Sequence, residues 1–195
     1  MILTTKMLLD QHRQYANPMS RIRILIKQGQ LIPLIRGLYE TDPDTPGHCL
    51  AGILYGPSYL SFEYALSFRG LIPEAVRVYT CATFGKRRTK QYHTFYGTYV
   101  YRDVPRAVYP HGIELRMENG YSSQIATSEK ALCDQLYSIS PLGTLRRLEQ
   151  YLLEDLRLND ESLQHLERED VITLSGLYGS LNVRLLAEYL QRSAR

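Results

Sequence analysis

The chain has 195 residues, which is enough for one or two domains with a substantial hydrophobic core. Hydrophobic residues make up 44% of it and charged residues 22%, and this composition excludes an intrinsically disordered protein. The formal net charge of +3 is too small to indicate a nucleic-acid partner, so the distribution of charge along the chain matters more.

The sequence predicts a cytoplasmic protein with no membrane partner. The opening stretch, MILTTKMLLD, lacks a long apolar core and includes an aspartate, so it does not have the features of a signal peptide. No apolar run approaches the length that spans a membrane. The cysteines Cys49, Cys81 and Cys133 lack metal-site spacing and are expected to be reduced, partly buried thiols.

The first elements in the chain are two predicted helices and a strand. Capping residues predict a helix over about 4–15, and the Asn17-Pro18 break starts a second helix that a glycine ends. Leu31 to Tyr39 predicts a strand, which Pro33 restricts to a sheet edge or a wing. The segment 40–47, ETDPDTPG, is predicted to be a linker because it is rich in Asp, Pro and Thr.

The second part of the chain mixes helices and strands. A short buried helix is predicted within 48–56, and a longer one within 61–70. Alternating side chains predict a strand over 76–84, and the aromatic, Thr-rich segment 92–104 predicts its return strand. The basic segment 85–91 would then form the turn of this hairpin.

Turn and capping signals place the remaining elements. Asn119-Gly120 is typical of a two-residue hairpin turn, Thr127 and Thr144 cap predicted helices, and two further helices close the chain. The predicted class is α+β: a small N-terminal winged-helix-like unit, then a mixed α/β domain with antiparallel hairpins and C-terminal helices. The predicted domains are 1–42 and 48–195.

A basic face on the second helix predicts DNA binding. Arg23 and Lys27 are four residues apart and share a face, with Arg21 to one side and apolar residues opposite. In a winged helix such a face enters the major groove, and the following hairpin contacts phosphates. Arg36 and Gly37 fall where that wing would turn, and glycine permits a tight turn there. The alternative is that the basic helix is only a solvated surface.

A second basic cluster lies at the tip of the predicted hairpin. Its members are Lys86, Arg87, Arg88 and Lys90, with the aromatic Tyr92 next to them. Cationic side chains beside aromatic rings suit a nucleic-acid backbone with stacking on exposed bases. They suit an acidic protein partner equally well, and a solubilising hairpin tip is the third interpretation.

We expect no enzymatic activity, no cofactor and no bound metal. The five histidines are far apart and form no HxH or HExxH arrangement, and the chain contains neither a P-loop nor a GxGxxG motif. A nuclease would need clustered acids near a lysine to hold metal ions. The adjacent Glu129 and Lys130 lie at a predicted helix start, where Glu129 is better explained by the helix dipole.

Four stretches of the chain, in this order and with similar spacing, resemble the AbiEi family of antitoxins. They are LIKQGQLIPLIRGLYE (25–40), YGPSYLSFEYALSFRGLIPEAV (55–76), YGTYVYRDVP (96–105) and QIATSEKALCDQLYSISP (124–141). The resemblance covers nearly the whole chain and weakens after about Leu158. No single stretch is diagnostic, so the match depends on the four together.

The resemblance implies an N-terminal winged helix-turn-helix that represses its own operon and a C-terminal domain that carries antitoxin activity. The partner gene in such a type IV toxin-antitoxin system encodes a nucleotidyltransferase-like toxin, which the antitoxin need not touch, and such pairs are linked to phage defence by abortive infection. The resemblance also implies that Ser20, Arg21, Arg23 and Lys27 lie on the recognition helix and Arg36 on the wing, facing double-stranded operator DNA.

The sequence departs from this family at its N-terminal end. A full three-helix unit has two helices before the recognition helix, whereas residues 4–16 have room for one normal helix, or for a very short helix and a turn. We therefore expect a shortened N-terminal domain. A second interpretation stays open: a protein that does not bind DNA, has a vestigial winged helix, and acts through its C-terminal domain on a toxin or on the toxin's target.

Overall fold

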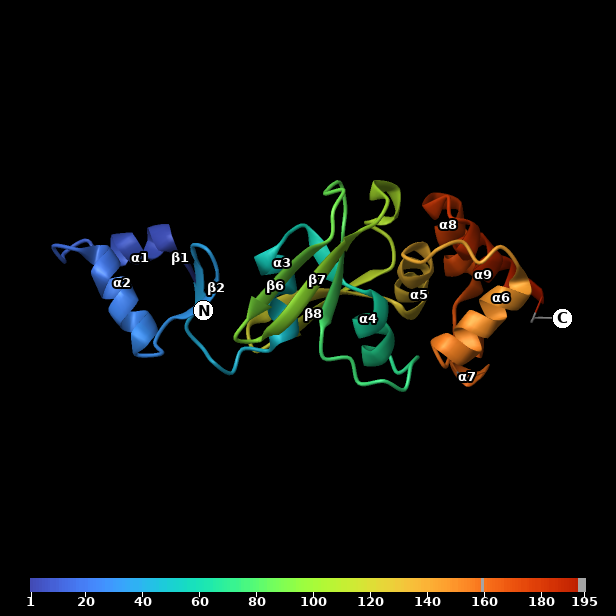
Figure 1. Ribbon diagram of the computed structural model, residues 1–195, viewed down its shortest axis with the longest axis horizontal. Coiled ribbons are helices and arrows are strands. Elements are labelled where there is room, and N and C mark those ends of the chain that lie inside the picture. Colours follow the sequence, from blue (N-terminus) through green and yellow to red (C-terminus); the bar gives the residue numbers. More distant parts are fainter. Residues whose placement is uncertain (159, 193–195) are drawn as a thin grey trace.

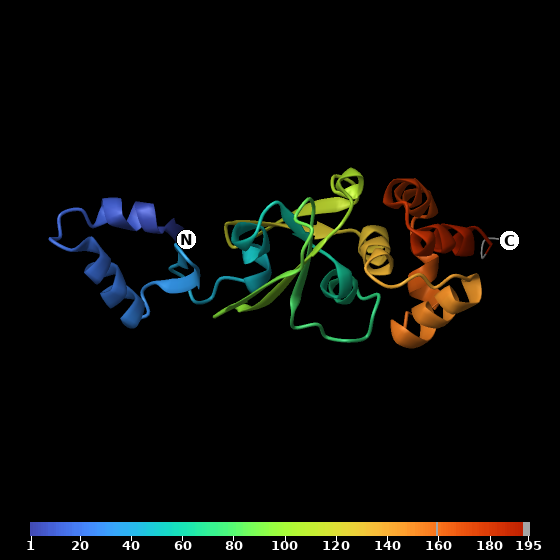
Figure 2. The same ribbon diagram turned by 45° about the horizontal axis from the view of Figure 1, so that its top comes forward.

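The computed structural model describes residues 1–158 and 160–192. Over these residues, three parts follow one another along an elongated molecule: a small N-terminal unit, a six-stranded sheet, and a group of helices at the C-terminal end (Figures 1 and 2). Helices and antiparallel hairpins are both present, and the helices gather mainly after the sheet. This architecture confirms the predicted α+β class.

The N-terminal unit, residues 1–40, combines two helices with a three-stranded antiparallel sheet. Its elements are β1 (Ile2–Thr4), α1 (Thr5–Gln11), α2 (Pro18–Lys27), β2 (Ile32–Ile35) and β3 (Leu38–Glu40). The strand order is β1-β3-β2, so β2 is an edge strand, as its Pro33 predicts. A helix followed by a short hairpin is the arrangement of a winged helix.

Capping explains where the two helices of this unit begin. The side chains of Thr4 and Asn17 each accept a hydrogen bond from a backbone N–H in the first turn of α1 and α2. The cap at Thr4 and the helix start at Asn17-Pro18 were predicted. Gly29, with a φ of 71°, follows α2 and ends it. The predicted end of the first helix near Tyr15 is wrong: α1 ends at Gln11, because the chain turns there to reverse direction before α2.

The six-stranded sheet has the strand order β6-β7-β5-β4-β9-β8. β5 with β7 and β4 with β9 are parallel, and the other neighbouring pairs are antiparallel. The strands are β4 (Ser58–Leu60), β5 (Tyr79–Thr83), β6 (Lys90–Thr94), β7 (Gly97–Asp103), β8 (Ile113–Glu118) and β9 (Tyr121–Ala126). Asn119 and Gly120 have φ values of 50° and 78°, which confirms the predicted hairpin turn between β8 and β9.

The predicted hairpin with the basic cluster at its tip is wrong. β5 and β7 are parallel, and β6 pairs with the far side of β7. The segment 84–89 therefore crosses the end of β7, where the Asp103 carboxylate accepts hydrogen bonds of 2.8–3.1 Å from the backbone N–H groups of Lys86 and Arg87. The true hairpin joins β6 to β7 through Phe95 and Tyr96. Local turn signals do not reveal this order, since strand order depends on contacts far apart in the chain.

Helices cover the sheet and continue beyond it. The predicted short helix after the linker is present as η1 (Gly47–Leu50) and α3 (Ala51–Leu54), and α4 (Phe62–Phe68) ends before Gly70, as predicted. The others are η2 (Arg106–Val108), α5 (Ser128–Tyr137), α6 (Leu145–Gln150), the π-helical turn η3 (Tyr151–Asp155), α7 (Asp160–Gln164), α8 (Arg168–Tyr178) and α9 (Leu181–Arg192). Thr127 and Thr144 cap α5 and α6 as predicted, whereas α7 is not predicted.

The hydrophobic side chains form two clusters. The smaller one lies inside the N-terminal unit and consists of Leu3, Leu8, Ile22, Leu25 and Leu31. The larger one fills the space between the sheet and the helices, with α5 at its centre and buried along most of its length. Leu34 of β2 belongs to this larger cluster. The N-terminal unit is therefore joined to the sheet by side-chain packing as well as by the connecting segment.

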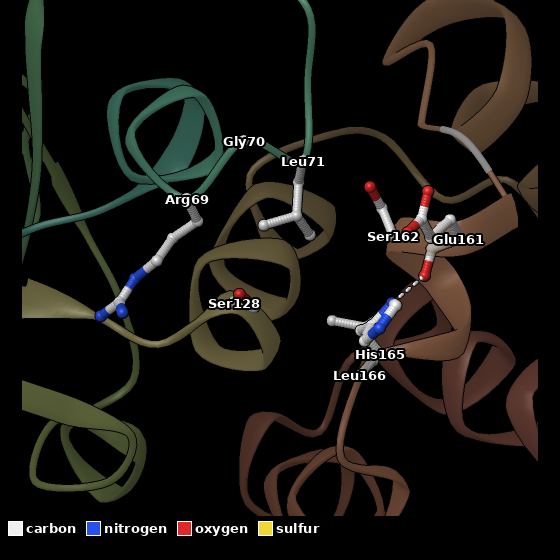
Figure 3. Close-up of a pocket in the computed structure, with 8 residues that line it drawn as sticks. All are labelled: Arg69, Gly70, Leu71, Ser128, Glu161, Ser162, His165 and Leu166. Carbon is white, nitrogen blue, oxygen red and sulfur yellow. Dashed lines mark hydrogen bonds between the residues drawn. The ribbon is translucent and has the colours of Figure 1, made fainter.

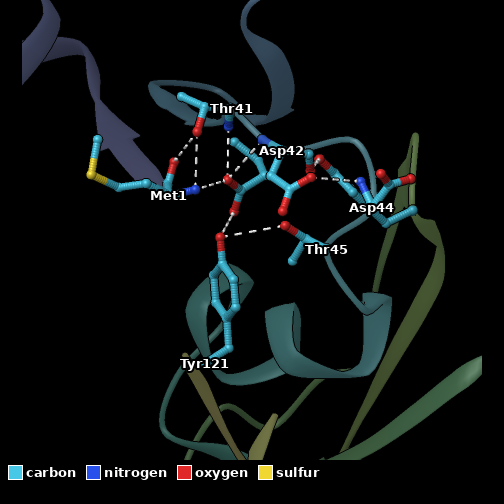
Figure 4. Close-up of polar contacts among 8 residues, drawn as sticks. Met1, Thr41, Asp42, Asp44, Thr45 and Tyr121 are labelled. Carbon is cyan, nitrogen blue, oxygen red and sulfur yellow. Dashed lines mark hydrogen bonds and ion pairs between the residues drawn. The ribbon is translucent and has the colours of Figure 1, made fainter. Parts of the chain in front are cut away.

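The predicted linker is a compact junction (Figure 4). Glu40 is fully buried, and its carboxylate accepts hydrogen bonds from the backbone N–H groups of Thr41 and Asp42. The hydroxyl of Tyr121, on β9, donates to the same carboxylate at 2.8 Å and accepts a hydrogen bond from the Thr45 hydroxyl at 3.3 Å. One side chain of the sheet thus holds both ends of the segment 40–45.

Candidate nucleic-acid interface

The face of α2 that points away from the N-terminal core is polar and basic. Ile22 and Leu25 are buried on the inner side of the helix, whereas the exposed residues of the outer side are Ser20, Arg23, Ile24 and Lys27. Arg23 and Lys27 can reach phosphates or base edges, and Ser20 can donate or accept a hydrogen bond. Ile24, 44% exposed, was not predicted and offers an apolar contact of the kind that thymine methyl groups accept.

Arg21 is placed differently from the two outward cations. Its guanidinium carbon lies 5.7 Å from the centroid of the Tyr15 ring, and the side chain is half-buried. Its Nε is buried and has no hydrogen-bond partner among the residues that the structure describes. Arg21 therefore packs on the turn between α1 and α2, to one side of the face formed by Arg23 and Lys27.

Arg36 and Gly37 form the turn between β2 and β3. Arg36 is exposed, and Gly37 has a φ of 85°, a conformation that favours glycine. The carbonyl of Gly37 accepts a hydrogen bond of 2.9 Å from the backbone N–H of Thr5, at the start of α1. The predicted wing turn at Arg36 and Gly37 is confirmed, and it divides the strand predicted over Leu31–Tyr39 into β2 and β3.

The segment before α2 contains one helix. β1 and the seven-residue α1 occupy residues 2–11, and turns fill the space up to α2. The N-terminal unit therefore has a single helix before its outward basic helix, as the length of this segment indicates. Its strand β1 pairs with β3 in the antiparallel sense.

The second basic cluster has a different shape from the predicted one. The Lys86 Nζ lies 5.0 Å from the centroid of the Tyr55 ring, and the Lys90 Nζ lies 5.1 Å from that of Tyr92. The two rings lie 6.1 Å apart, so lysines from the crossing loop and from β6 share an aromatic surface with Tyr55. Tyr55, near the end of α3, was missed because only folding brings it to this loop.

Arg87 and Arg88 lie outside this aromatic contact. Both are exposed on the loop that crosses the end of β7. At the opposite end of the β6–β7 hairpin, the Tyr96 hydroxyl donates to the backbone carbonyl of Asp42, which places that end beside the junction. The basic loop and the outer face of α2 are therefore separate surfaces, and the structure does not bring them together in one site.

A cluster of five buried polar side chains lies in the larger core and was not predicted. Lys130 and Asp134, one turn apart on α5, are fully buried, with 3.3 Å between Nζ and Oδ1. The Tyr178 hydroxyl of α8 accepts from Lys130 at 2.7 Å and donates to Asp134 Oδ1 at 2.5 Å. Asp134 Oδ2 accepts from the Tyr59 hydroxyl at 2.9 Å and the Ser61 hydroxyl at 2.6 Å.

This buried cluster links β4, α5 and α8 and suits a structural role. Burial raises the pKa values of Tyr59 and Tyr178 further above neutrality, and burial also lowers the pKa of Lys130 against the opposing effect of Asp134. Each charged group is satisfied by its neighbours, which is the condition for keeping a carboxylate inside a core. The members of the cluster hydrogen-bond to one another.

A surface cavity of about 350 Å³ lies between the end of α4, the start of α5 and α7 (Figure 3). The guanidinium of Arg69 is already engaged, since it donates to the Ala126 carbonyl at 2.9–3.1 Å and to the Glu114 carboxylate at 2.8 Å. The His165 ring forms a 2.6 Å hydrogen bond with the Glu161 carbonyl. The two basic side chains of the cavity lining, Arg69 and His165, are therefore both hydrogen-bonded to neighbouring groups.

Residues 1–158 and 160–192 contain neither a cluster of metal ligands nor a helix that could span a membrane. In this part of the chain, no three His, Cys, Asp or Glu side chains lie close enough together to hold a metal ion. Among the helices of the same residues, none has the length and apolar character needed to cross a bilayer. The rings of His48, His93 and His165 bond to nearby side chains or carbonyls, as in the 3.1 Å contact of His48 with Glu118.

Comparison with known proteins supports the fold. No family model matches the sequence, and no curated protein is significantly similar to it. Among solved structures, the crystal structure of the Rv2827c protein from Mycobacterium tuberculosis is similar, with a TM-score of 0.56 and 17% sequence identity. The match covers 98% of this chain and 71% of that one. At this identity the similarity concerns the fold alone.

Proposed function

We propose that this protein is an antitoxin that also represses its own operon. In this proposal the N-terminal unit binds promoter DNA through α2 and the β2–β3 turn. The domain over 48–195 counteracts a nucleotidyltransferase-type toxin. The proposal that α2 binds DNA rests on its outward face, where the side chains of Arg23 and Lys27 are exposed and lie outside the hydrophobic core.

Each exposed residue has a stated role in this proposal. The outer face of α2 enters the major groove, where Ser20 and Ile24 contact base edges and the two cations contact bases or phosphates. Arg36, at the turn after β2, contacts the phosphate backbone beside the groove. Most of the binding free energy then comes from phosphate contacts, which makes the affinity strongly dependent on salt.

The antitoxin half rests on the resemblance of the four stretches to the AbiEi family. Two of them, 55–76 and 124–141, are joined in the structure by the buried contacts of Asp134 with Tyr59 and Ser61. These two stretches are thus packed together in one structural unit. The toxin or its target would be met by surfaces outside that core.

The first test is a binding titration against the protein's own promoter fragment and a scrambled fragment, at two salt concentrations. Replacing Arg23, Lys27 and Arg36 with alanine should abolish the preference for the promoter. It should also lower the slope of log affinity against log salt by about 3, since each lost phosphate contact contributes about 0.9. Unchanged binding by this variant would contradict the proposal.

A matched control removes the same amount of charge elsewhere. Arg146, Arg147 and Arg184 are exposed on α6 and α9, at the other end of the molecule, and their replacement with alanine should leave promoter binding unchanged. DNA binding and antitoxin activity can also be tested separately. The variant with Arg23, Lys27 and Arg36 replaced by alanine should lose repression and keep protection against the toxin.

A second candidate function is favoured by the single helix before α2 and the two-residue turn of the wing. On this alternative the protein does not bind DNA and acts through the domain over 48–195 on the toxin or its target. The same titration separates the two: the alternative predicts no preference for the promoter at either salt concentration, together with full protection by the wild-type protein.

A further inference from the structure

The free edge of the sheet at β8 carries apolar side chains on one face and charges of both signs on the other. Leu115 and Met117 are 66% and 69% exposed and, two residues apart in a strand, point to the same side. Glu114 and Arg116 point to the opposite side and are also exposed. β8 pairs with β9 alone within the described chain, so the backbone groups along its outer side lack a strand partner.

An edge strand of this kind can pair with a strand of another chain, and one way in which proteins prevent such pairing is to place charged side chains, especially lysine, on the edge. The other edge of the same sheet shows that device. β6 carries Lys90 and no acidic residue, and the loop before it adds Arg87 and Arg88, so two copies of β6 would repel each other. β8 differs because its Glu114 and Arg116 can form ion pairs across a pair of strands.

We infer that two copies of this chain pair along β8, antiparallel, about a two-fold axis through Leu115. In this register, Leu115 lies opposite Leu115 of the second copy, and Ile113 lies opposite Met117. Glu114 lies opposite Arg116 of the second copy, and the symmetry repeats this ion pair. Residues directly opposite on antiparallel strands point to the same face, so apolar meets apolar and acid meets base. The two sheets become one continuous sheet.

The present contacts of β8 leave these groups available. The guanidinium of Arg116 lies 4.9 Å from the centroid of the Phe68 ring, and no carboxylate of the described chain is within ion-pair distance of it. Glu114 uses one oxygen, Oε2, to bind Arg69 at 2.8 Å, and its side chain stays 48% exposed. Ile53 on α3, 38% exposed, extends the apolar side.

The charge pattern also selects the register. A two-fold axis through Arg116 would place Arg116 opposite itself and Glu114 opposite Glu118, so that like charges meet at each position. The axis through Leu115 instead uses Ile113 to Met117 in full and leaves the turn of the hairpin free. The free edge is therefore complementary to a second copy in one alignment and repulsive in the neighbouring one.

The test is the mass of the full-length chain by sedimentation equilibrium over a range of concentrations. We expect a concentration-dependent mass that approaches twice the chain mass of 22.5 kDa. Arg116→Glu places carboxylates opposite each other at both pairs and should raise the dissociation constant about 100-fold or more, and Glu114→Arg should do the same with two cations. Lys90→Glu, on the other edge, should leave the dimer unchanged.

Charge exchange makes the test specific. The double variant Glu114→Arg, Arg116→Glu should dimerise again, and a mixture of the two single variants should form a heterodimer, which also shows that both are folded. A wild-type chain that stays monomeric at every concentration overturns the inference. So does an Arg116→Glu protein that dimerises like the wild type, or a mixture that does not associate. No DNA or toxin is present, so the result is independent of the proposed function.

Discussion

Asp134 is a buried carboxylate that four donors satisfy: Lys130, Tyr178, Tyr59 and Ser61. A buried ion pair contributes little net stability relative to a well-packed apolar core, because both ions lose their water. Removing one partner is much more damaging, since the other charge then stays buried and unpaired. Asp134 is therefore important mainly because its loss would leave the Lys130 ammonium buried without a carboxylate partner.

We expect Asp134→Ala to lower the free energy of unfolding by about 3–5 kcal/mol, because Lys130 would lose its carboxylate and three hydroxyl groups would lose part of their hydrogen bonding. Chemical denaturation of both proteins measures the difference. Glu149→Ala, at an exposed position on α6, is the control and should change stability by less than about 0.5 kcal/mol. A loss below about 1 kcal/mol for Asp134→Ala would show that the cluster is not a structural tie.

The same scale shows what could be predicted of the candidate site. Arg23 and Lys27 were predicted to share a face because helical spacing is a local property, and the structure places both on the outer side of α2. The contact of Lys86 with Tyr55 depends on folding and was missed. The sequence contains one local signal of the buried cluster: Lys130 and Asp134 lie four residues apart on a helix, and every residue between them is apolar.

At the scale of elements, local sequence signals predicted helix starts and turns correctly, whereas the pairing of distant strands was not predicted. The cap of α5, the start of α2 at Asn17-Pro18 and the Asn119-Gly120 turn were predicted, because each depends on hydrogen bonds or backbone angles within a few residues. The parallel pairing of β5 with β7 depends on segments that meet only in the folded sheet. Because the strand pairing was predicted wrongly, the position of the basic loop was predicted wrongly as well.

The basic loop that crosses the end of β7 is the element to test next. We expect replacement of Lys86, Arg87, Arg88 and Lys90 with alanine to weaken either DNA binding or protection against the toxin by about tenfold. The backbone of the loop should stay in place, because Asp103 binds its N–H groups and not its side chains. Promoter titration and toxin co-expression are the two measurements.

Asp103→Ala is the complementary variant for this loop. It keeps all four cations and removes the carboxylate that holds the loop backbone, so any loss it causes reflects loop position and not charge. If the variant without the four cations retains both activities, the loop is a solubilising surface only.

At the scale of the whole molecule, the junction at Glu40 sets how the N-terminal unit meets the sheet. Burial raises the pKa of Glu40, but hydrogen bonds from the Met1 amine, the Tyr121 hydroxyl and two backbone N–H groups outweigh burial and lower it. A lowered pKa in the folded state stabilises the fold fully above the unfolded pKa of about 4.3. That stabilisation is lost as the pH falls through the folded-state pKa.

We expect Glu40→Gln to lower the free energy of unfolding by about 1–2 kcal/mol at neutral pH, because several charge-assisted hydrogen bonds weaken. The difference from the wild type should shrink as the pH falls below about 4 and the wild-type carboxylate becomes protonated. Thermal unfolding of both proteins across this range measures it, with Glu149→Gln as an exposed control. A difference that is constant with pH would exclude an ionised Glu40 as the cause.

The strand order also determines the sequence of events when the chain folds. All contacts within the N-terminal unit lie in the first 40 residues, whereas the centre of the six-stranded sheet requires β4 to pair with β9, at Leu60 and Ile125. Pairings between distant segments form slowly, because the chain loses loop entropy before they contribute. As the ribosome releases the chain, α2 can therefore form before β9 is available to pair with β4. The basic helix is then complete before the sheet against which the N-terminal unit packs.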